Sequence, residues 1–393
     1  MKEVFIVSAC RTPIGSFGGA LSSLTAPKLG AIVIEEAIKR ANISKDSINE
    51  VIMGNVIQAG VGQAPARQAA LYAGLPSSVE TFTVNKVCGS GLKAIMLASQ
   101  SIALGDADII VAGGMESMSN APYLIPQARY GYRYGNGELQ DSLMKDGLQD
   151  VYQNVPMGNF AEQCAKECNV PRDAQDEFAI LSYKRAQESI NTGRFKDEIV
   201  KVPIVGKKGE TTYVEVDEEP FKTNFDKIPT LRPAFQKDGT VTAANSSKIN
   251  DGAAALVLMS AEKVKSLGIK PIAKIVASAS AAKEPNWFTT APADVIPKVL
   301  MKAGLNIGDI DLFEINEAFA VVTLVVNKII GIDINKVNVN GGAVALGHPI
   351  GASGARITVS LLHALRQRNL KRGMSAICIG GGEASGLIVE LLS

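Results

Sequence analysis

The length and charge of the chain exclude several classes of protein. Its 393 residues exceed the usual size of one hydrophobic core, which predicts two or three domains. With 40 basic and 39 acidic residues the net charge is +1, which argues against a dedicated nucleic-acid surface. Five cysteines, odd in number and scattered, argue against a disulfide framework and favour a reducing compartment.

Neither a membrane span nor a targeting segment is expected. No run of about 18 wholly apolar residues occurs, and Val4–Val7 is typical of a buried first strand and not of a signal peptide. These patterns favour a cytoplasmic location. Cys164 and Cys168 are four residues apart and lack histidine partners, so we interpret them as helix residues and not as metal ligands.

The chain predicts the same succession of elements twice. A strand, an amphipathic helix and a short apolar segment fall at 4–7, 28–41 and 43–54 in the first half, and at 273–277, 292–303 and 305–316 in the second. Further along, 89–91 corresponds to 352–354, each at the start of a helix, and the apolar run 108–116 corresponds to 376–383. The matching order predicts a duplicated α/β domain with mostly parallel sheets.

The first half carries a long insertion. Its last strand, expected at 253–258, is delayed by more than a hundred residues, whereas the corresponding strand at 386–391 follows directly in the second half. Long insertions are usually lids or binding elements, and ligands of α/β sheets bind beyond the carboxyl ends of the strands. We predict an N-terminal half at 1–118 and 249–270, an inserted domain at 119–248, and a C-terminal half at 271–393.

Cys88 lies at a junction suited to a nucleophile. β-branched residues lead into Asn85-Lys86-Val87-Cys88-Gly89-Ser90-Gly91, and a helical pattern follows. At such a junction the backbone N–H groups and the helix dipole favour a thiolate, and glycine lets a substrate approach the backbone closely. A small buried cysteine before an ordinary helix is the alternative interpretation.

Three further polar side chains fall at strand ends of the second half. His348 lies in a glycine-rich loop, in the place that Cys88 occupies in the first half, whereas His363 lies in a predicted helix and is interpreted as structural. His348 is therefore the candidate base for Cys88. Cys378 comes shortly before three glycines, and Asn316 follows another predicted strand. Together these four residues predict a catalytic site.

The motifs resemble those of the thiolase family over essentially the whole chain. The matching stretches are 85–91, 113–119, 316–319, 341–351 and 378–382. Their details are most similar to acetyl-CoA C-acetyltransferases, also called acetoacetyl-CoA thiolases. The resemblance implies duplicated thiolase-type α/β domains, layered α-β-α-β-α, with an inserted loop domain, and a homotetramer built as a dimer of dimers.

The resemblance also implies a role for each residue of the site. Cys88, activated by His348, would carry an acetyl group as a thioester, and Cys378 would remove a proton from the methyl carbon of a second acetyl-CoA. His348, with a water held by Asn316, would stabilise one thioester oxyanion, and the N–H groups of Cys88 and Gly380 would stabilise the other. The implied reaction is the reversible Claisen condensation of two acetyl-CoA to acetoacetyl-CoA and CoA, without a covalently bound cofactor.

The insertion is expected to bind coenzyme A. The residues that match the family's CoA contacts are Leu148, Met157, Lys227, Leu231, Ala234, Phe235, Ala243, Ser247, Ala318 and Phe319. Of these, Ser247 would bind the pantetheine arm and Lys227 a phosphate, while Phe288 would wall the acyl pocket. Pro156 replaces a histidine that many close relatives carry before the Met-Gly pair, which removes one polar contact near the ligand.

Potassium activation is a further expectation from the resemblance. Some acetoacetyl-CoA thiolases, the mitochondrial branch, are activated by potassium. The positions that hold the ion there correspond to Tyr183, Ala243, Ala244, Ser246 and Val344.

Several other functions stay open as alternatives. The nearest is a degradative 3-ketoacyl-CoA thiolase of broader chain length. A β-ketoacyl-carrier-protein synthase shares the duplicated architecture, but the second thiol, Cys378, argues against it. A non-catalytic acyl-CoA-binding protein would not need the reactive groups. A nicotinamide-binding enzyme is disfavoured because no Gly-x-Gly-x-x-Gly follows the first strand.

Overall fold

The computed structural model describes residues 2–392, which form two half-sheets of similar strand order. The first half-sheet has the order β4-β3-β5-β10-β1 and the second the order β12-β13-β14-β11. Their strands are β1 (Val4–Arg11), β3 (Glu50–Gly54), β4 (Glu80–Val84), β5 (Ile109–Ser117), β10 (Asn250–Ser260), β11 (Ala273–Ala282), β12 (Leu312–Ile315), β13 (Arg372–Ile379) and β14 (Glu383–Leu391). The half-sheets join where Phe5 and Ile6 of β1 pair with Lys274 and Ala273 of β11.

The prediction of mostly parallel sheets is wrong. Only β3–β4, β3–β5 and β12–β13 run parallel, whereas β5–β10, β10–β1, β13–β14 and β14–β11 run antiparallel. The reason is visible at β13 and β14, which are joined by the three-residue turn Gly380–Gly382. A turn that short can connect only antiparallel strands, because a parallel pair needs a crossover.

The two halves of the chain contain corresponding helices and turns in the same order, as the internal repeat predicts. The predicted helices at 28–41 and 292–303 are α1 (Ala26–Ala41) and α7 (Ala291–Ala303). Ile48 and Ile310 each close a 3₁₀ turn, Lys45–Ser47 or Ile307–Asp309, that leads into β3 or β12. The counterpart of β4 in the second half is reduced to one parallel bridge between Phe313 and Val337.

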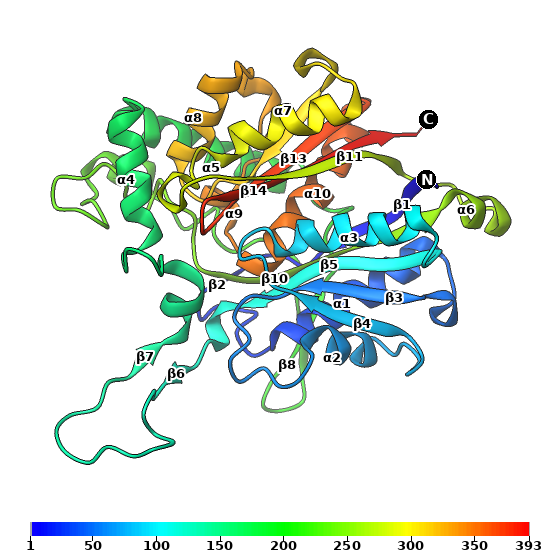
Figure 1. Cartoon of the computed structure of the whole chain (residues 1–393), viewed down its shortest axis with the longest axis horizontal. Helices are drawn as coiled ribbons and strands as arrows, with labels where there is room; N and C mark the ends of the chain where they lie inside the picture. Colours follow the sequence, from blue (N-terminus) through cyan, green and yellow to red (C-terminus); the bar gives the residue numbers. More distant parts are fainter. Residues whose placement is uncertain (1, 393) are drawn as a thin grey trace.

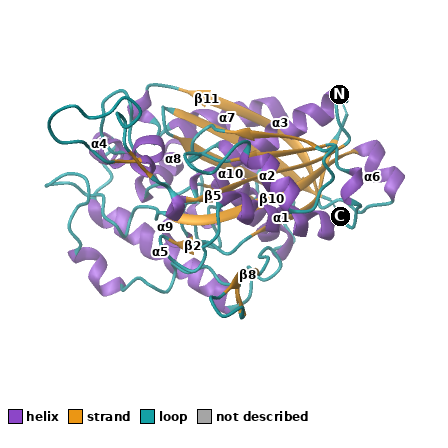
Figure 2. Cartoon of the chain, turned by 90° about the horizontal axis from the view of Figure 1, so that it is seen from below, coloured by secondary structure: helices purple, strands orange, loops and turns teal. Residues whose placement is uncertain are grey.

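The elements stack in five layers, α-β-α-β-α (Figures 1 and 2). The helices α3 (Ser90–Leu104) and α10 (Ile350–Gln367) lie between the half-sheets, while α1 and α2 (Pro65–Tyr72) cover one outer face and α7 and α8 (Ala320–Ile330) the other. Glycines let the central helices touch. A Cβ at Gly91 would lie 2.9 Å from the backbone nitrogen of Ala355, and one at Gly354 would lie 2.4 Å from that of Leu92.

The central position of α3 explains its composition. The stretch Val87–Leu104 is long and apolar enough to cross a membrane by those two criteria, with a mean hydropathy of 1.3 over 18 residues. Half of this window is buried inside the protein. A helix packed between two sheets needs apolar side chains on most of its circumference, so burial in the core accounts for its hydropathy.

Between β5 and β10 the chain leaves the half-sheets and forms a long series of elements. They are β6 (Tyr123–Leu124), β7 (Gln140–Asp141), a π-helical turn (Met144–Leu148), α4 (Met157–Glu167), α5 (Arg172–Asn191), β8 (Val202–Val205), β9 (Thr211–Val214) and a 3₁₀ segment (Phe225–Thr230). Those around β6, β7 and α4 lie at one end of the molecule, whereas α5 packs against α8 and β8 lies near α1 and α2 (Figure 1). The remaining elements are β2 (Gly15–Ser16), α6 (Ala261–Leu267) and α9 (Ala343–Leu346), with short 3₁₀ turns at 118–120, 285–287 and 334–336. The three predicted domain boundaries stay a prediction.

All five cysteines are free. Cys164 lies in α4 and Cys168 directly follows its last residue. Within residues 2–392 no group of three or more His, Cys, Asp or Glu side chains is placed to hold a metal ion.

Candidate active site

The turn before α3, which carries Cys88, is strained at the preceding residue. Val87 has a φ of +44°, which a β-branched residue rarely adopts. Three hydrogen bonds fix the turn: the Asn85 side chain accepts from the Val87 N–H at 3.0 Å, the Ser90 hydroxyl donates to the Val87 carbonyl at 2.7 Å, and the same hydroxyl oxygen accepts from the Lys86 N–H at 2.8 Å. Backbone strain persists only where its surroundings enforce it, and it concentrates at functional sites.

The Cys88 turn is tied to the turn that follows β13. Lys86 forms an ion pair with Glu383, the first residue of β14. Burial raises the pKa of the Cys88 thiol from 9.0 to about 11, although the backbone N–H groups of Gly380 and of Cys88 itself act in the opposite direction. The thiol is therefore protonated at neutral pH, and two N–H groups, one from each half, lie within reach of its sulfur.

His348 lies in the loop between α9 and α10 and is buried. Its backbone N–H donates to Asn250 at 2.9 Å, its Nδ1 is 2.6 Å from the Ser353 hydroxyl, and its Nε2 is 3.5 Å from the Asn316 side-chain nitrogen. Burial, assisted by the charge of Arg356, lowers the pKa of His348 from 6.5 to about 3. The imidazole is therefore neutral at physiological pH.

Asn316 and Cys378 complete the group from the second half. Asn316 directly follows β12, where its N–H donates to the Ala376 carbonyl at 2.9 Å, and its side-chain oxygen is buried with no hydrogen-bond partner in the described chain. Burial raises the pKa of the Cys378 thiol, and the neighbouring Cys88 raises it further, while the N–H groups of Cys378 and Ala318 oppose this. The two thiols are thus close enough to interact.

A buried carboxylate connects the two halves next to this group. Glu116, near the end of β5, accepts hydrogen bonds from the Asn55 side chain at 2.7 Å and from the N–H groups of Val56, Ile57 and Gly351 at 3.0, 3.2 and 2.9 Å. Burial raises the pKa of Glu116 from 4.5 to about 7. Glu116 had no role predicted from the sequence, although it lies at the end of an apolar run and within the matching stretch 113–119.

A cavity of about 620 Å³ lies against His348. Among the predicted CoA contacts, its lining includes Leu148, Met157, Ala234, Phe235, Ala243, Ser247 and Phe319. Lys227, Leu231 and Ala318 do not line it. Pro156 lines it too, as does Ser246, which the resemblance assigned to potassium. The lining residues without a predicted role are Ser16, Phe17, Met118, Met144, Gly158, Glu219, Lys222, Lys248, Ile249 and Ile350.

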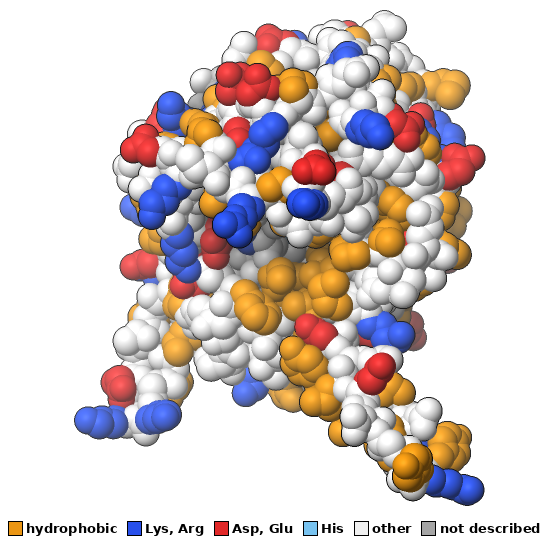
Figure 3. All heavy atoms as spheres, turned by 90° about the vertical axis from the view of Figure 1, so that its left-hand side faces the viewer, with side chains coloured by type: hydrophobic (Ala, Val, Ile, Leu, Met, Phe, Trp, Pro, Cys, Tyr) orange, Lys and Arg blue, Asp and Glu red, His pale blue; other side chains and the backbone are white. Residues whose placement is uncertain are grey.

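Figure 3 shows the face that carries the projecting segments, where hydrophobic side chains gather in a hollow between them. The cavity lining is likewise mainly apolar and contains only a few polar side chains. Pockets of this kind are typical of binding sites for small molecules and cofactors. The lining residues without a predicted role come from elements and loops far apart in the sequence, and the fold brings them together.

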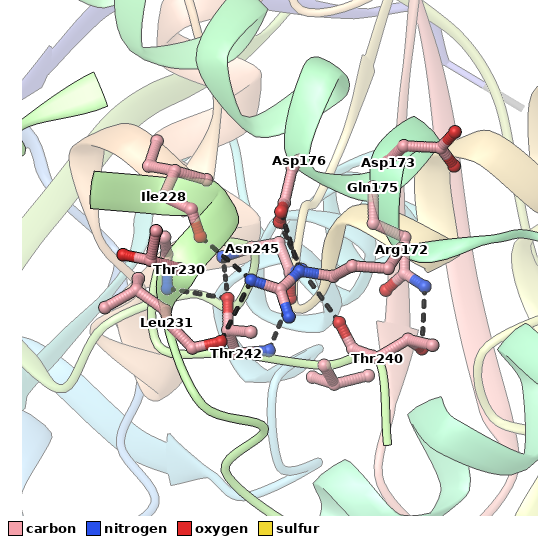
Figure 4. A network of polar contacts seen from close by, with 12 residues as sticks. Arg172, Asp173, Gln175, Asp176, Ile228, Thr230, Leu231, Thr240, Thr242 and Asn245 are labelled. Atoms are coloured by element: carbon pink, nitrogen blue, oxygen red, sulfur yellow. Dashed lines mark hydrogen bonds and ion pairs between the residues drawn. The ribbon is translucent and has the colours of Figure 1, made fainter. Parts of the chain in front are cut away.

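A polar network fixes part of the cavity wall to α5 (Figure 4). The Arg172 guanidinium donates to the Asp176 carboxylate at 2.6 Å and to the carbonyls of Ile228 and Leu231 at 2.8 and 3.1 Å. The other Asp176 oxygen accepts from the Asn245 side chain at 2.9 Å. These bonds hold the segment 228–231 and Asn245 against α5. The chain between them supplies Ala234, Phe235 and Ala243 to the cavity lining. Leu231 contributes its backbone carbonyl to this network.

The residues predicted to hold potassium are brought together in part. Tyr183 and Val344 pack in one apolar cluster, and the carbonyls of Ala243 and Ser246 both accept hydrogen bonds from Lys248. Lys248 also lies over the Tyr183 ring, 5.6 Å from its centroid. Most of the predicted ligands therefore surround one place, where a lysine ammonium is present.

Comparison with known proteins places this arrangement in a family. Residues 4–262 match the family model "Thiolase, N-terminal domain" and residues 269–391 match "Thiolase, C-terminal domain". A relative from Dictyostelium discoideum named "Probable acetyl-CoA acetyltransferase" is 56% identical over 392 residues, which cover 100% of this chain and 95% of the relative.

Two solved structures match over the whole chain. The acetyl-CoA acetyltransferase of Bacillus anthracis has a TM-score of 0.98 and 43% identity, covering 100% of this chain and 99% of that one. The Acat5 thiolase of Ascaris suum, solved in complex with coenzyme A, has a TM-score of 0.94 and 46% identity, covering 100% of both chains. The chain belongs to the thiolase family.

Proposed function

We propose that the protein is an acyltransferase, an acetyl-CoA C-acetyltransferase that interconverts two acetyl-CoA with acetoacetyl-CoA and CoA. The names of relatives at more than half identity over the full length support this activity. The observations that carry the proposal are two neighbouring thiols, Cys88 and Cys378, and a buried imidazole, His348, that lies beside Asn316 and lines an apolar cavity. Two thiols with one neutral imidazole fit acyl transfer followed by proton removal from carbon.

The first step transfers an acetyl group to Cys88. The Cys88 sulfur attacks the thioester carbonyl of acetyl-CoA while the Cys88 proton passes to Nε2 of His348. The bond between the carbonyl carbon and the CoA sulfur then breaks, and His348 passes the proton on to the departing CoA. Burial raises the pKa of Cys88 and lowers that of His348, which favours proton transfer during the attack over an ion pair formed beforehand. The N–H groups of Cys88 and Gly380 would stabilise the oxyanion.

The second step forms the carbon–carbon bond. Cys378 passes its own proton to Nε2 of His348 and, as a thiolate, removes a proton from the methyl carbon of a second acetyl-CoA. The carbanion attacks the acetyl group on Cys88, whose sulfur leaves and takes the proton held by His348. A thiolate whose conjugate acid has a raised pKa is a strong base, as this proton removal requires. His348, with Asn316 beside its Nε2, would stabilise the enolate oxygen.

A degradative 3-ketoacyl-CoA thiolase of broader chain length is the second candidate. Phe288 favours the short-chain reaction, because its ring is buried and packs at 67° against that of Phe319, which lines the cavity, with 6.4 Å between the centroids. A bulky ring beside the lining limits the length of acyl chain that fits.

Trapping the acyl-enzyme tests the proposal. After mixing with acetyl-CoA and acid quenching, mass spectrometry of peptides should find one acetyl group on Cys88. Cys88→Ala should abolish the label and the overall reaction, and Cys378→Ala should keep the label but lose condensation. Cys168→Ala removes a half-buried thiol outside the site and serves as the matched control. An unlabelled Cys88 in active protein would contradict the mechanism.

The predicted homotetramer is a further part of the proposal. One observation that supports it is that β4 is the edge strand of its half-sheet and exposes Phe82. Another is the arm between β6 and β7, on which Tyr130 and Tyr134 are 87% and 102% exposed. Unpaired strand edges and exposed aromatic side chains are typical of protein interfaces. Native mass spectrometry should find four copies, and replacing 126–138 by a short Gly-Ser turn should leave dimers; a tetramer that survives the replacement would contradict this assembly.

The cytoplasmic location and the potassium site stay predictions. Coenzyme A thioesters as substrates are supported by the names of the relatives and by the CoA complex of the Ascaris protein.

A further inference from the structure

Lys248 folds back on the segment that precedes it. Its ammonium donates to the carbonyl of Ala243 at 2.6 Å and to that of Ser246 at 3.1 Å, and it lies 5.6 Å from the centre of the Tyr183 ring. The side chain is half-buried at the wall of the cavity. An ammonium has three hydrogens, so two meet carbonyl oxygens, and the positive charge also faces an aromatic ring.

The segment that supplies these carbonyls is irregular and needs a positive partner. The Thr242 hydroxyl accepts from the Ala244 N–H at 3.2 Å, and the Ser246 hydroxyl donates to the Thr242 carbonyl at 2.7 Å. These bonds curl the chain so that the carbonyls of Ala243 and Ser246 converge on one point. Converging carbonyl oxygens bind a monovalent cation in the same way that they bind an ammonium group.

The residues fit a potassium ion only in part. The Tyr183 hydroxyl is buried with no hydrogen-bond partner in the described chain, which is a suitable further oxygen for a cation. However, the carbonyls of Ala243 and Ser246 are already taken by a group of charge +1. A potassium ion at the same carbonyls would be repelled by the ammonium and would have to displace it.

We propose that the ammonium of Lys248 is the built-in monovalent cation of this site, so that the protein needs no potassium. The proposal rests on the proposed function only where it concerns substrate affinity. Ser247, within the curled segment, lines the cavity, and its N–H donates to the Ala318 carbonyl at 3.0 Å. The lysine thereby holds one wall of the cavity in the shape that receives the ligand.

Thermal unfolding of the purified full-length protein tests the proposal without reference to activity. The unfolding midpoint is measured in potassium chloride and in choline chloride at equal ionic strength. The unmodified protein should have the same midpoint in both salts. Lys248→Ala should unfold several degrees lower in choline chloride and regain a few degrees in potassium chloride, because a ligand that binds only the native state raises the midpoint. Lys248→Met keeps the aliphatic stem and provides a second variant if the alanine variant does not fold.

Steady-state kinetics provide the second measurement. In choline chloride, Lys248→Ala should raise the KM for acetoacetyl-CoA severalfold, and potassium chloride should lower it again. The KM of the unmodified enzyme should be the same in both salts. Lys328→Ala is the matched control, because this lysine also donates to a backbone carbonyl, that of Cys168 at 3.1 Å, but lies outside the cavity lining.

Three outcomes would overturn the proposal. They are potassium stabilisation of the unmodified protein, a Lys248→Ala variant unchanged in midpoint and KM, or a loss of stability that potassium does not restore. If every variant and the unmodified protein lack acetyl transfer, the proposed function fails, but the unfolding midpoints still decide the role of Lys248.

Discussion

Nδ1 of His348 lies 2.6 Å from Oγ of Ser353, and this contact determines which ring nitrogen carries the proton. The single hydroxyl hydrogen of Ser353 is donated to the Pro349 carbonyl at 2.9 Å. Towards His348 the hydroxyl oxygen can therefore only accept, so the hydrogen of the neutral ring is on Nδ1. Nε2 is left with its lone pair beside Asn316, as a base that acts on Cys88 requires.

Ser353→Ala should slow acetylation of Cys88 about tenfold to hundredfold. The buried Nδ1–H would lose its acceptor, which costs about 1–3 kcal/mol, and the other tautomer of His348 would gain population. Rapid quenching with acetyl-CoA, followed by mass spectrometry, measures the rate. The control is Thr358→Ala, one turn further along α10, which loses hydroxyl bonds to the Gly354 carbonyl at 3.0 Å and to Ser375. Equal rates in the two variants would show that Ser353 does not orient the imidazole.

The alkylation rate of Cys88 in the free enzyme should increase steadily with pH. Burial raises the pKa of this thiol from 9.0 to about 11, so the reactive thiolate gains about tenfold per pH unit between pH 7 and 10. His348, with a pKa lowered to about 3, stays neutral over this range and adds no second step. Iodoacetamide labelling of the unliganded enzyme measures the rate. A plateau reached below pH 8 would instead indicate a thiolate–imidazolium pair.

The pKa shift of Cys88 also gives a stability prediction. A thiol whose pKa is raised in the folded state stabilises the fold fully below the unfolded value of 9.0, and this contribution is lost as the pH rises from 9 towards 11. Cys88→Ser should therefore lose less stability than the unmodified protein between pH 8 and 10. Urea unfolding at the two pH values gives the comparison, and equal losses would contradict the raised pKa.

Two glycines of one turn should respond differently to alanine. A Cβ at Gly380 would meet the Val87 side chain at 3.5 Å and Met157 at 3.7 Å, which are ordinary contacts, whereas Gly382 has a φ of +88° and its Cβ would lie 2.4 Å from the Lys283 carbonyl. Gly380→Ala should keep the unfolding midpoint and lower kcat/KM about tenfold or more, because its methyl group crowds an N–H beside the reacting carbonyl. Gly382→Ala should lower the midpoint. The idea fails if the two variants unfold alike.

Phe288→Leu should widen the range of acyl chains. The smaller side chain opens the wall beside Phe319 at a modest loss of stability. The ratio of thiolysis rates for 3-ketohexanoyl-CoA and acetoacetyl-CoA should rise severalfold. Phe178→Leu, a buried phenylalanine of α5, is the matched control and should leave the ratio unchanged. An unaltered ratio in Phe288→Leu would remove this residue from the acyl pocket.

The sequence was sufficient for the features that local pattern determines. The strands and helices around Cys88 and the repeat were found because periodicity and short motifs encode them. The roles of the reactive residues stay a prediction. Strand direction was predicted wrongly, although the short connection of three glycines before β14 is visible in the sequence and allows only an antiparallel pair.

The sequence pattern also does not reveal which side chains and backbone groups contact one another in the folded protein. The contact of Lys248 with Ala243 lies within five residues but depends on a curled backbone. The four donors to Glu116 come from segments about sixty residues earlier and more than two hundred later in the chain.

The unfavourable φ of Val87 has a consequence for protein engineering. Glycine or asparagine would relieve that conformation, and screens for heat tolerance reward such changes. The same substitution would make the position of the Cys88 sulfur relative to the attacked carbonyl less fixed. Selection for thermal stability alone should therefore recover substitutions at residue 87 that lower the turnover rate. The turnover rate has to be measured in the same screen.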